Sequence, residues 1–163
     1  MQTAYKYFAG RGIAGGLVDL APYAIDSFIN EEENGVLKPG LAAMSGTTAG
    51  THIKLYTGAN ANFEGVINNN RNTEYDLDGY IRVLKGAGVG VVRWGRVYVR
   101  VAEDVTVAYD DPLYVVKTGD ETGFFTNTAG AAGSETAVAV RGRFLGPVEN
   151  GIAPVELFNQ ADA

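Results

Sequence analysis

Hydrophobic and polar residues alternate most regularly near the middle of the chain, between residues 96 and 101. The alternating sets are Val97, Val99 and Val101 against Arg96, Tyr98 and Arg100. A period of two places each set on one face of an extended chain, which predicts a half-buried β-strand. After the polar pair Glu103-Asp104, the alternation returns over residues 105–109, and we expect a further strand there.

Short apolar runs separated by turn residues continue along the rest of the chain. Turns are expected at Asp110-Asp111-Pro112 and at Thr118-Gly119-Asp120, because Asp, Pro and Gly favour turn conformations. Strands spaced by roughly 8–12 residues are typical of a β-sandwich or a β-barrel, and no segment shows a sustained helical period. We therefore predict an all-β fold, a small β-barrel or sandwich. The further predicted strands are residues 52–56, 80–84, 113–116, 123–126, 136–140, 141–144 and 155–158.

The first 45 residues have a different pattern from the rest. A glycine-rich stretch at residues 10–16 and the helix-breaking Pro22 argue against a continuous helix. Residues 25–33 form either one short helical turn or an extended segment that ends in a turn at Asn34-Gly35. This part of the chain therefore predicts an extended arm with an anchoring strand.

The segment Lys38-Pro39-Gly40 predicts a type II turn, because proline fixes φ at the second position and glycine accepts a positive φ at the third. The residues before it are rich in aromatic side chains, which a solvated tail rarely carries. We predict an extended glycine-rich N-terminal arm and anchoring segment over residues 1–45 and a β-domain over residues 46–163. The aromatic residues are Tyr5, Tyr7, Phe8, Tyr23 and Phe28.

Composition narrows the possible functions. Glycine accounts for 22 of 163 residues, nearly twice an average usage of about 7%, in keeping with many tight turns. The chain has no cysteine, which excludes disulfides and thiol catalysis. The net charge of −6 argues against sequence-independent binding of nucleic acid. We expect a soluble protein, because the sequence has neither a secretory signal nor an apolar run of about 20 residues.

Motifs that carry chemistry are weak in this chain. The string Gly10-x-Gly12-x-x-Gly15 matches the dinucleotide-binding fingerprint, but no βαβ pattern surrounds it. His52 is the only histidine, which excludes multi-histidine metal sites and most Ser-His-Asp arrangements. The string Asp76-x-Asp78-Gly79 lacks the third acidic position and the distal glutamate of an EF-hand loop. We therefore predict no catalytic residue, no cofactor and no metal ion.

Charge changes sign between neighbouring predicted strands. Residues 79–102 contain cations but no acid, whereas residues 103–121 contain acids with only Lys117 opposing. Such strips suit self-association, docking on a charged partner, or pairing within the chain. Trp94 and Tyr98 lie among the cations, a composition found in interface hot spots and also in barrel packing. The cations are Arg82, Lys85, Arg93, Arg96 and Arg100, and the acids are Glu103, Asp104, Asp110, Asp111, Asp120 and Glu121.

Several segments share their order and spacing with one protein family. They are GIAGGLVD at residues 12–19 with YAIDS at 23–27 and Asn30-Glu31, GRVYVRV at 95–101, DDPLYV at 110–115, RGRF at 141–144 and APVEL at 153–157. Together they resemble the structural cement, or head-decoration, proteins of tailed bacteriophages over nearly the whole chain. The family often has Gly-Asp before Pro-Leu-Tyr, where this chain has Asp110-Asp111.

The resemblance implies a non-enzymatic virion protein that is made in the host cytoplasm and binds the outer capsid surface, where it cements the expanded head. Its implied partner is the major capsid protein, with an arm over neighbouring subunits and no contact with nucleic acid or membrane. We expect self-association, as a trimer in preference to a dimer. The predicted capsid or subunit interface residues are Tyr5, Tyr7, Phe8, Arg11, Asp19, Tyr23, Phe28, Trp94, Arg96, Tyr98 and Arg100.

Three other functions remain open on the sequence. A carbohydrate- or receptor-binding β-module would show an exposed aromatic platform beside carboxylates. A small hydrolase relying on acids alone would show a deep pocket around a carboxyl group of raised pKa. Another phage structural role, such as a tail or connector component, is compatible with the same all-β pattern.

Overall fold

The structure is a computed structural model that describes residues 12–58, 62–69, 74–75 and 81–159. These residues form strands and loops but no helix, and so no helix among them is long and apolar enough to cross a membrane. The strands are β1 (Ala24–Asn30), β2 (Ala42–Ser45), β3 (His52–Leu55), β4 (Phe63–Ile67), β5 (Glu74–Tyr75), β6 (Ile81–Arg82), β7 (Gly88–Arg100), β8 (Pro112–Val116), β9 (Phe125–Thr126), β10 (Gly130–Ala131), β11 (Ser134–Glu135), β12 (Ala137–Phe144) and β13 (Ile152–Leu157).

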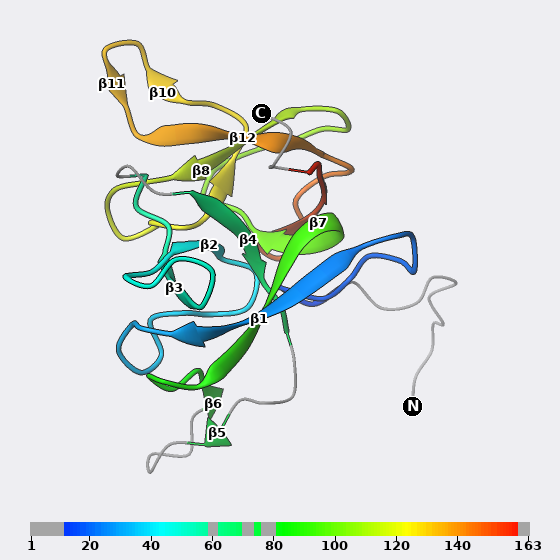
Figure 1. Cartoon of the computed structure of the whole chain (residues 1–163). Coiled ribbons are helices and arrows are strands. Elements are labelled where there is room, and N and C mark those ends of the chain that lie inside the picture. Colours follow the sequence, from blue (N-terminus) through cyan, green and yellow to red (C-terminus); the bar gives the residue numbers. More distant parts are fainter. Residues whose placement is uncertain (1–11, 59–61, 70–73, 76–80, 160–163) are drawn as a thin grey trace, which may run out of the picture.

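Five strands close on themselves as a ring, which we call the first ring. The order is β1-β3-β2-β4-β7, and β7 pairs again with β1 to complete it (Figure 1). The β1–β3 contact is parallel and short, since only Ile29 and Asn30 take part, whereas β1 and β7 pair antiparallel over most of β1. The interior is filled by Phe28, Leu37, Ala43, Ile53, Ile67, Val83, Val89 and Val91.

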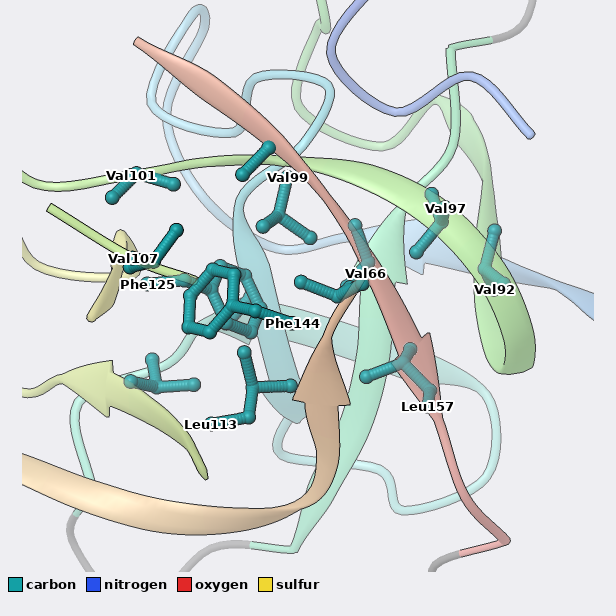
Figure 2. Packing of buried hydrophobic residues seen from close by; sticks show 14 of the residues in the cluster. Val66, Val92, Val97, Val99, Val101, Val107, Leu113, Phe125, Phe144 and Leu157 are labelled. Carbon is teal, nitrogen blue, oxygen red and sulfur yellow. The ribbon is translucent and has the colours of Figure 1, made fainter. Parts of the chain in front are cut away.

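The second ring uses the other half of β7. Its order is β7-β13-β12-β8-β9, and Val101, just after β7, bridges to Phe125 of β9 in parallel. Phe125 and Phe144 are both 0% exposed, and Figure 2 shows their side chains together at the centre of the core, with Val99, Val107 and Leu113 around them. The alternative between barrel and sandwich is thus resolved in favour of a small β-barrel with extra strands.

The N-terminal segment continues the first ring along β7. Gly15 N donates to Tyr98 O at 2.8 Å, and Tyr98 N donates to Gly16 O at 2.9 Å. Gly12 lies so close to the Tyr98 ring that a Cβ at residue 12 would come within 2.0 Å of it. Residues 15–18 therefore run antiparallel to one end of β7, as β1 does at the other end, and a loop at residues 19–23 separates the two paired stretches.

Most of the predicted strands are confirmed. The alternation at residues 96–101 belongs to β7, where Val97, Val99 and Val101 are buried. Of the two alternatives for residues 25–33, the extended one is correct, because β1 occupies this segment. The type II turn is also confirmed, with φ of 85° at Gly40 and a hydrogen bond from Leu41 N to Lys38 O.

The expected strand at residues 105–109 is wrong. Val107 is buried and Val105 packs beside it, so the alternation does reflect burial. However, the backbone there pairs with no neighbouring strand, and positive φ values of 57° at Asp104 and 72° at Asp110 turn the chain at both ends. The segment lies against the core as an irregular loop.

The division of the chain at residue 45 stays a prediction. Within the described part, residues 12–45 supply β1 and β2 to the nine-stranded sheet and so pack as part of the β-domain. The first part of the predicted arm, residues 1–11, lies outside the described residues.

Candidate interaction surface

The loop at residues 19–23 is the most exposed apolar feature of the described chain. It projects from the body at the start of β1, the blue strand of Figure 1. Leu20 at its tip is 91% exposed, and Tyr23 is 44% exposed. The backbone pairing with β7 stops after Val18, whose N–H donates to Arg96 O at 3.1 Å, and Pro22 has no N–H with which to resume it. The loop therefore presents a leucine and a tyrosine to solvent.

Gly95 of β7 allows this loop to lie against the sheet. Its φ of 115° falls in the region that favours glycine. A Cβ at this position would come within 2.7 Å of the Cβ of Tyr23. The loop and the bend in β7 therefore fix each other, and neither would keep its shape if residue 95 carried a side chain.

A groove runs beside the loop, with a volume of about 520 Å³. Trp94 and Phe158, both in its lining, are 37% and 42% exposed. We call the loop and this groove together the loop–groove surface. The groove is lined by Ala21, Pro22, Trp94, Gly95, Arg96, Glu156, Leu157, Phe158 and Asn159.

A chain of ion pairs borders the groove. Arg96 contacts Asp19 at 2.8 Å and Glu156 at 3.4 Å, and so joins the loop to β13. Glu156 also contacts Arg143 at 2.9 Å, and Arg143 contacts Asp110 at 3.0 Å. The border of the groove thus carries both signs of charge in alternation across the outer surface of three strands.

The pKa values along this chain shift as ion pairing requires. The hydrogen bond from Arg96 lowers the pKa of Asp19, assisted by the backbone N–H of Ala21. Hydrogen bonding to Asp19, in turn, raises the pKa of Arg96. The pKa of Arg143 rises through its hydrogen bonds to Asp110 and then Glu156. Asp19, Arg96 and Arg143 are therefore held in their charged forms near neutral pH.

The chemistry of this surface suits binding. Exposed Trp, Tyr and Arg side chains are the residues that most often dominate binding energy at protein interfaces. Across the described ranges, no group of three or more acidic, histidine or cysteine side chains is placed to hold a metal ion. The surface offers apolar contact area and oriented charges.

The structure brings together four of the predicted interface residues, Asp19, Tyr23, Trp94 and Arg96, at this surface. The other described ones lie elsewhere. Phe28 is buried in the first ring at 4% exposure, and Tyr98 lies beneath Gly12. Arg100 donates from Nε to Pro39 O at 2.8 Å, and burial lowers its pKa. Tyr5, Tyr7, Phe8 and Arg11 lie outside the described residues.

The sequence reasoning missed Leu20, Glu156 and Phe158. A signal existed for Leu20, because an apolar residue two positions before Pro22, in a segment predicted as an extended arm, is rarely buried in the core of its own domain. For Glu156 and Phe158 there was none. They reach the groove only because β13 pairs with β7, with Glu156 opposite Arg96.

In the ion pairs that the structure defines, the cations of residues 79–102 do not contact the acids of residues 103–121. Lys85 contacts Glu33 at 2.5 Å, and Arg93 contacts Asp26 at 3.2 Å. Arg96 contacts acids before and after it in the chain, as described above. These cations thus bind acids outside residues 103–121.

A second groove, with a volume of about 780 Å³, lies in the second ring on the acidic strip. Its acids include Glu103 and Glu121, and the Glu121 carboxylate accepts a hydrogen bond from Glu103 N. Four threonines also line it, so this groove is far more polar than the loop–groove surface. They are Thr118, Thr126, Thr128 and Thr136.

Comparison with known proteins places the chain in a family. Residues 1–158 match the family model described as "Structural cement protein (E217 gp24/Pam3 gp6)". Among curated proteins, no relative matches the chain. A chain in the solved structure described as "The capsid of Myoviridae Phage XM1" has a similar fold, with a TM-score of 0.71 and 18% sequence identity. That similarity covers 98% of both chains.

Proposed function

The chain belongs to the structural cement protein family, and from this membership we propose that it binds the outer surface of a phage capsid and stabilises the expanded head. The observation that carries the proposal is the family match over residues 1–158, nearly the full length. The fold similarity to a phage capsid chain supports a structural, capsid-associated role. In this role the protein is a non-enzymatic component of the virion, and its partner is the major capsid protein.

The fold is suited to mechanical reinforcement. Two rings that share one long strand cannot slide without breaking the backbone pairing of β7 on both edges. Many copies on one head, each with a modest interface, add up to strong resistance through multivalency. The aromatic residues predicted for the interface at positions 5, 7 and 8 are proposed to add contacts with neighbouring capsid subunits.

Co-sedimentation with expanded heads that lack the protein tests this function, with unexpanded proheads as the control. We expect saturable binding to expanded heads and a higher temperature of head disruption. Deletion of residues 1–11 should weaken binding and leave the fold intact. The deletion must stop before residue 12, because Gly12 and the following segment pack on β7. Absence of binding to either particle would exclude the cement function.

A carbohydrate-binding function is a second candidate. Trp94 is an exposed aromatic side chain in a groove that also holds the Glu156 carboxylate, the combination expected for such a module. A glycan array with the purified protein and a Trp94→Ala variant tests it. Binding of a glycan that depends on Trp94, without binding to heads, would favour this function over cementing.

A further inference from the structure

We propose that the loop–groove surface binds a second copy of the same surface, so that Leu20 of each copy enters the groove of the other. The pairing is reciprocal and two-fold. It goes beyond the cement function, which a single copy, a dimer or a trimer could perform. It does not depend on that function, and the experiment below needs no capsid.

The first observation is that the exposed Leu20 and the groove that receives it in the proposed pair are neighbours on one molecule. Ala21 and Pro22 belong to the loop and also line the groove, directly beside the exposed Leu20. In a two-fold contact the same patch faces itself, so a projection and a hollow placed side by side can each find its counterpart. A cyclic trimer needs the two on surfaces well separated around the molecule. The adjacency therefore favours a two-fold pair over the expected trimer.

The second observation is the charge at the border of the groove. Asp19, Arg96 and Glu156 place both signs on one patch. A patch that must face a copy of itself needs both signs, because a single sign would repel. The chain as a whole carries a net charge of −6, so an arbitrary face would meet its copy with like charge. The border is a place where acids and cations alternate closely.

The third observation is the exposure of the apolar side chains and the volume of the groove. Leu20 is 91% exposed, far more than Trp94 and Phe158 beside the groove. A leucine held away from the body loses nearly all its contact with water if it enters a groove of about 520 Å³. Trp94 and Phe158 in the groove lining offer aromatic surface for it to contact, and Tyr23 of the loop adds a further exposed aromatic side chain.

Cysteine pairs give a direct test, because the natural chain contains no cysteine. Leu20→Cys and Phe158→Cys variants are made separately and mixed under mild oxidation, without heads. We expect a disulfide-linked dimer in the mixture at several times the level formed by either variant alone. The variant that carries both cysteines should stop at the dimer. A ladder of trimers and larger species would show head-to-tail contacts and overturn the two-fold pairing.

Sedimentation of the unmodified protein and of Leu20→Asp provides the second measurement. We expect the dissociation constant of the dimer to rise by about 30-fold or more in Leu20→Asp, the size of a hot-spot loss. Ile13→Asp is the matched control, since Ile13 is 61% exposed and outside the loop and groove. It should leave the dimer unchanged. A thermal melt checks that both variants fold.

Other occupants of the loop–groove surface would give different results in these experiments. If the unmodified protein stays monomeric and no mixed disulfide forms, the second-copy pairing is wrong. If Leu20→Asp then also fails to bind expanded heads, the surface faces the capsid. If dimers form as expected but no copy binds heads, the pairing stands and the cement function fails.

Discussion

The two rings share β7 but are held together by different means. The second ring encloses two phenylalanines, Phe125 and Phe144, each completely buried. The first ring encloses one phenylalanine, Phe28, among aliphatic residues, and it has a cluster of charges where its core ends. There Arg93 reaches Asp26 at 3.2 Å and Glu64 at 3.3 Å, and the Ser45 hydroxyl donates to the Glu64 carboxylate.

The position of this charged cluster follows from strand alternation. Arg93 comes two residues after Val91, Ser45 two after Ala43 and Asp26 two before Phe28. Each apolar member of these pairs lies in the core of the first ring, so the polar member faces the same way at its end. The comparison teaches that the second ring depends on apolar packing, whereas the first ring combines apolar packing with ion pairs at the end of its core. Substitutions can remove each contribution separately.

The largest effect is expected from Phe144→Ala in the second ring. Truncating a fully buried phenylalanine removes its apolar contacts and leaves a cavity, which costs about 3–5 kcal/mol of unfolding free energy. Chemical denaturation followed by intrinsic fluorescence measures it. Phe158→Ala is the matched control, because the same change at a side chain that is 42% exposed should cost under about 1 kcal/mol. Equal losses would show that the second ring does not rest on its phenylalanine core.

The second ring was also the easier part to predict from sequence. Its strands β8, β12 and β13 have clear alternation or clear turns at their ends, so their positions could be expected to within a few residues. The first ring could not be assembled in the same way. Its strands β2 and β4 have short apolar runs interrupted by Ser45, Glu64 and Gly65, which break a period-two pattern. β4 is buried through its pairing with β7, which is distant in sequence, and β2 through its pairing with β3 and β4.

The interaction surface was predictable only in part, for a similar reason. Trp94 and Arg96 stand out by residue type in an exposed setting, and Tyr23 by its place in an aromatic segment. What joins them is the antiparallel register that sets Ala24 opposite Trp94. The register between distant segments depends on the closed barrel, and the local sequence does not determine it.

A smaller effect is expected when the charged cluster of the first ring is broken by Arg93→Met. The Glu64 side chain is only 9% exposed and would lose its cation. Unpairing a buried charge costs several kcal/mol, but Arg93 is itself 40% exposed. We therefore expect a loss of about 1–3 kcal/mol in unfolding free energy. Denaturation curves measure this loss.

The double variant Arg93→Met with Glu64→Gln should recover part of that loss, because it removes the unpaired charge as well. Lys85→Met is the control for loss of a surface cation. Lys85 and Glu33 are 55% and 77% exposed, so that change should cost under about 0.5 kcal/mol. A loss in Arg93→Met no larger than in Lys85→Met would mean that the cluster contributes nothing to closing the ring.

The smallest effect is expected at Glu31, which follows β1 and ties the first ring to the turn before β3. Its carboxylate accepts hydrogen bonds from Thr47 N at 3.0 Å and Thr47 Oγ1 at 2.9 Å, and Lys54 lies at 3.3 Å. The backbone N–H of Thr47, above all, lowers the pKa of Glu31 from 4.5 to about 2. The pairing therefore persists in moderately acidic solution.

A carboxyl group whose pKa is lower in the folded chain than in the unfolded chain stabilises the fold only while it is ionised. For Glu31 this contribution is complete above pH 4.5 and is lost as the pH falls towards about 2. Glu31→Gln should therefore melt at a lower temperature than the unmodified protein above pH 4.5, and the gap should close near pH 2. Glu33→Gln, an exposed carboxylate nearby, controls for the change in net charge and should show a smaller gap. Hydrogen exchange should locate the loss of protection in β1 and β3, with the second ring unaffected, because Thr47 and Lys54 both lie on the first ring's side.

A difference in melting temperature that stays constant at every pH would mean that Glu31 acts through packing. The electrostatic contrast between the rings would then rest on Arg93 and Glu64 alone.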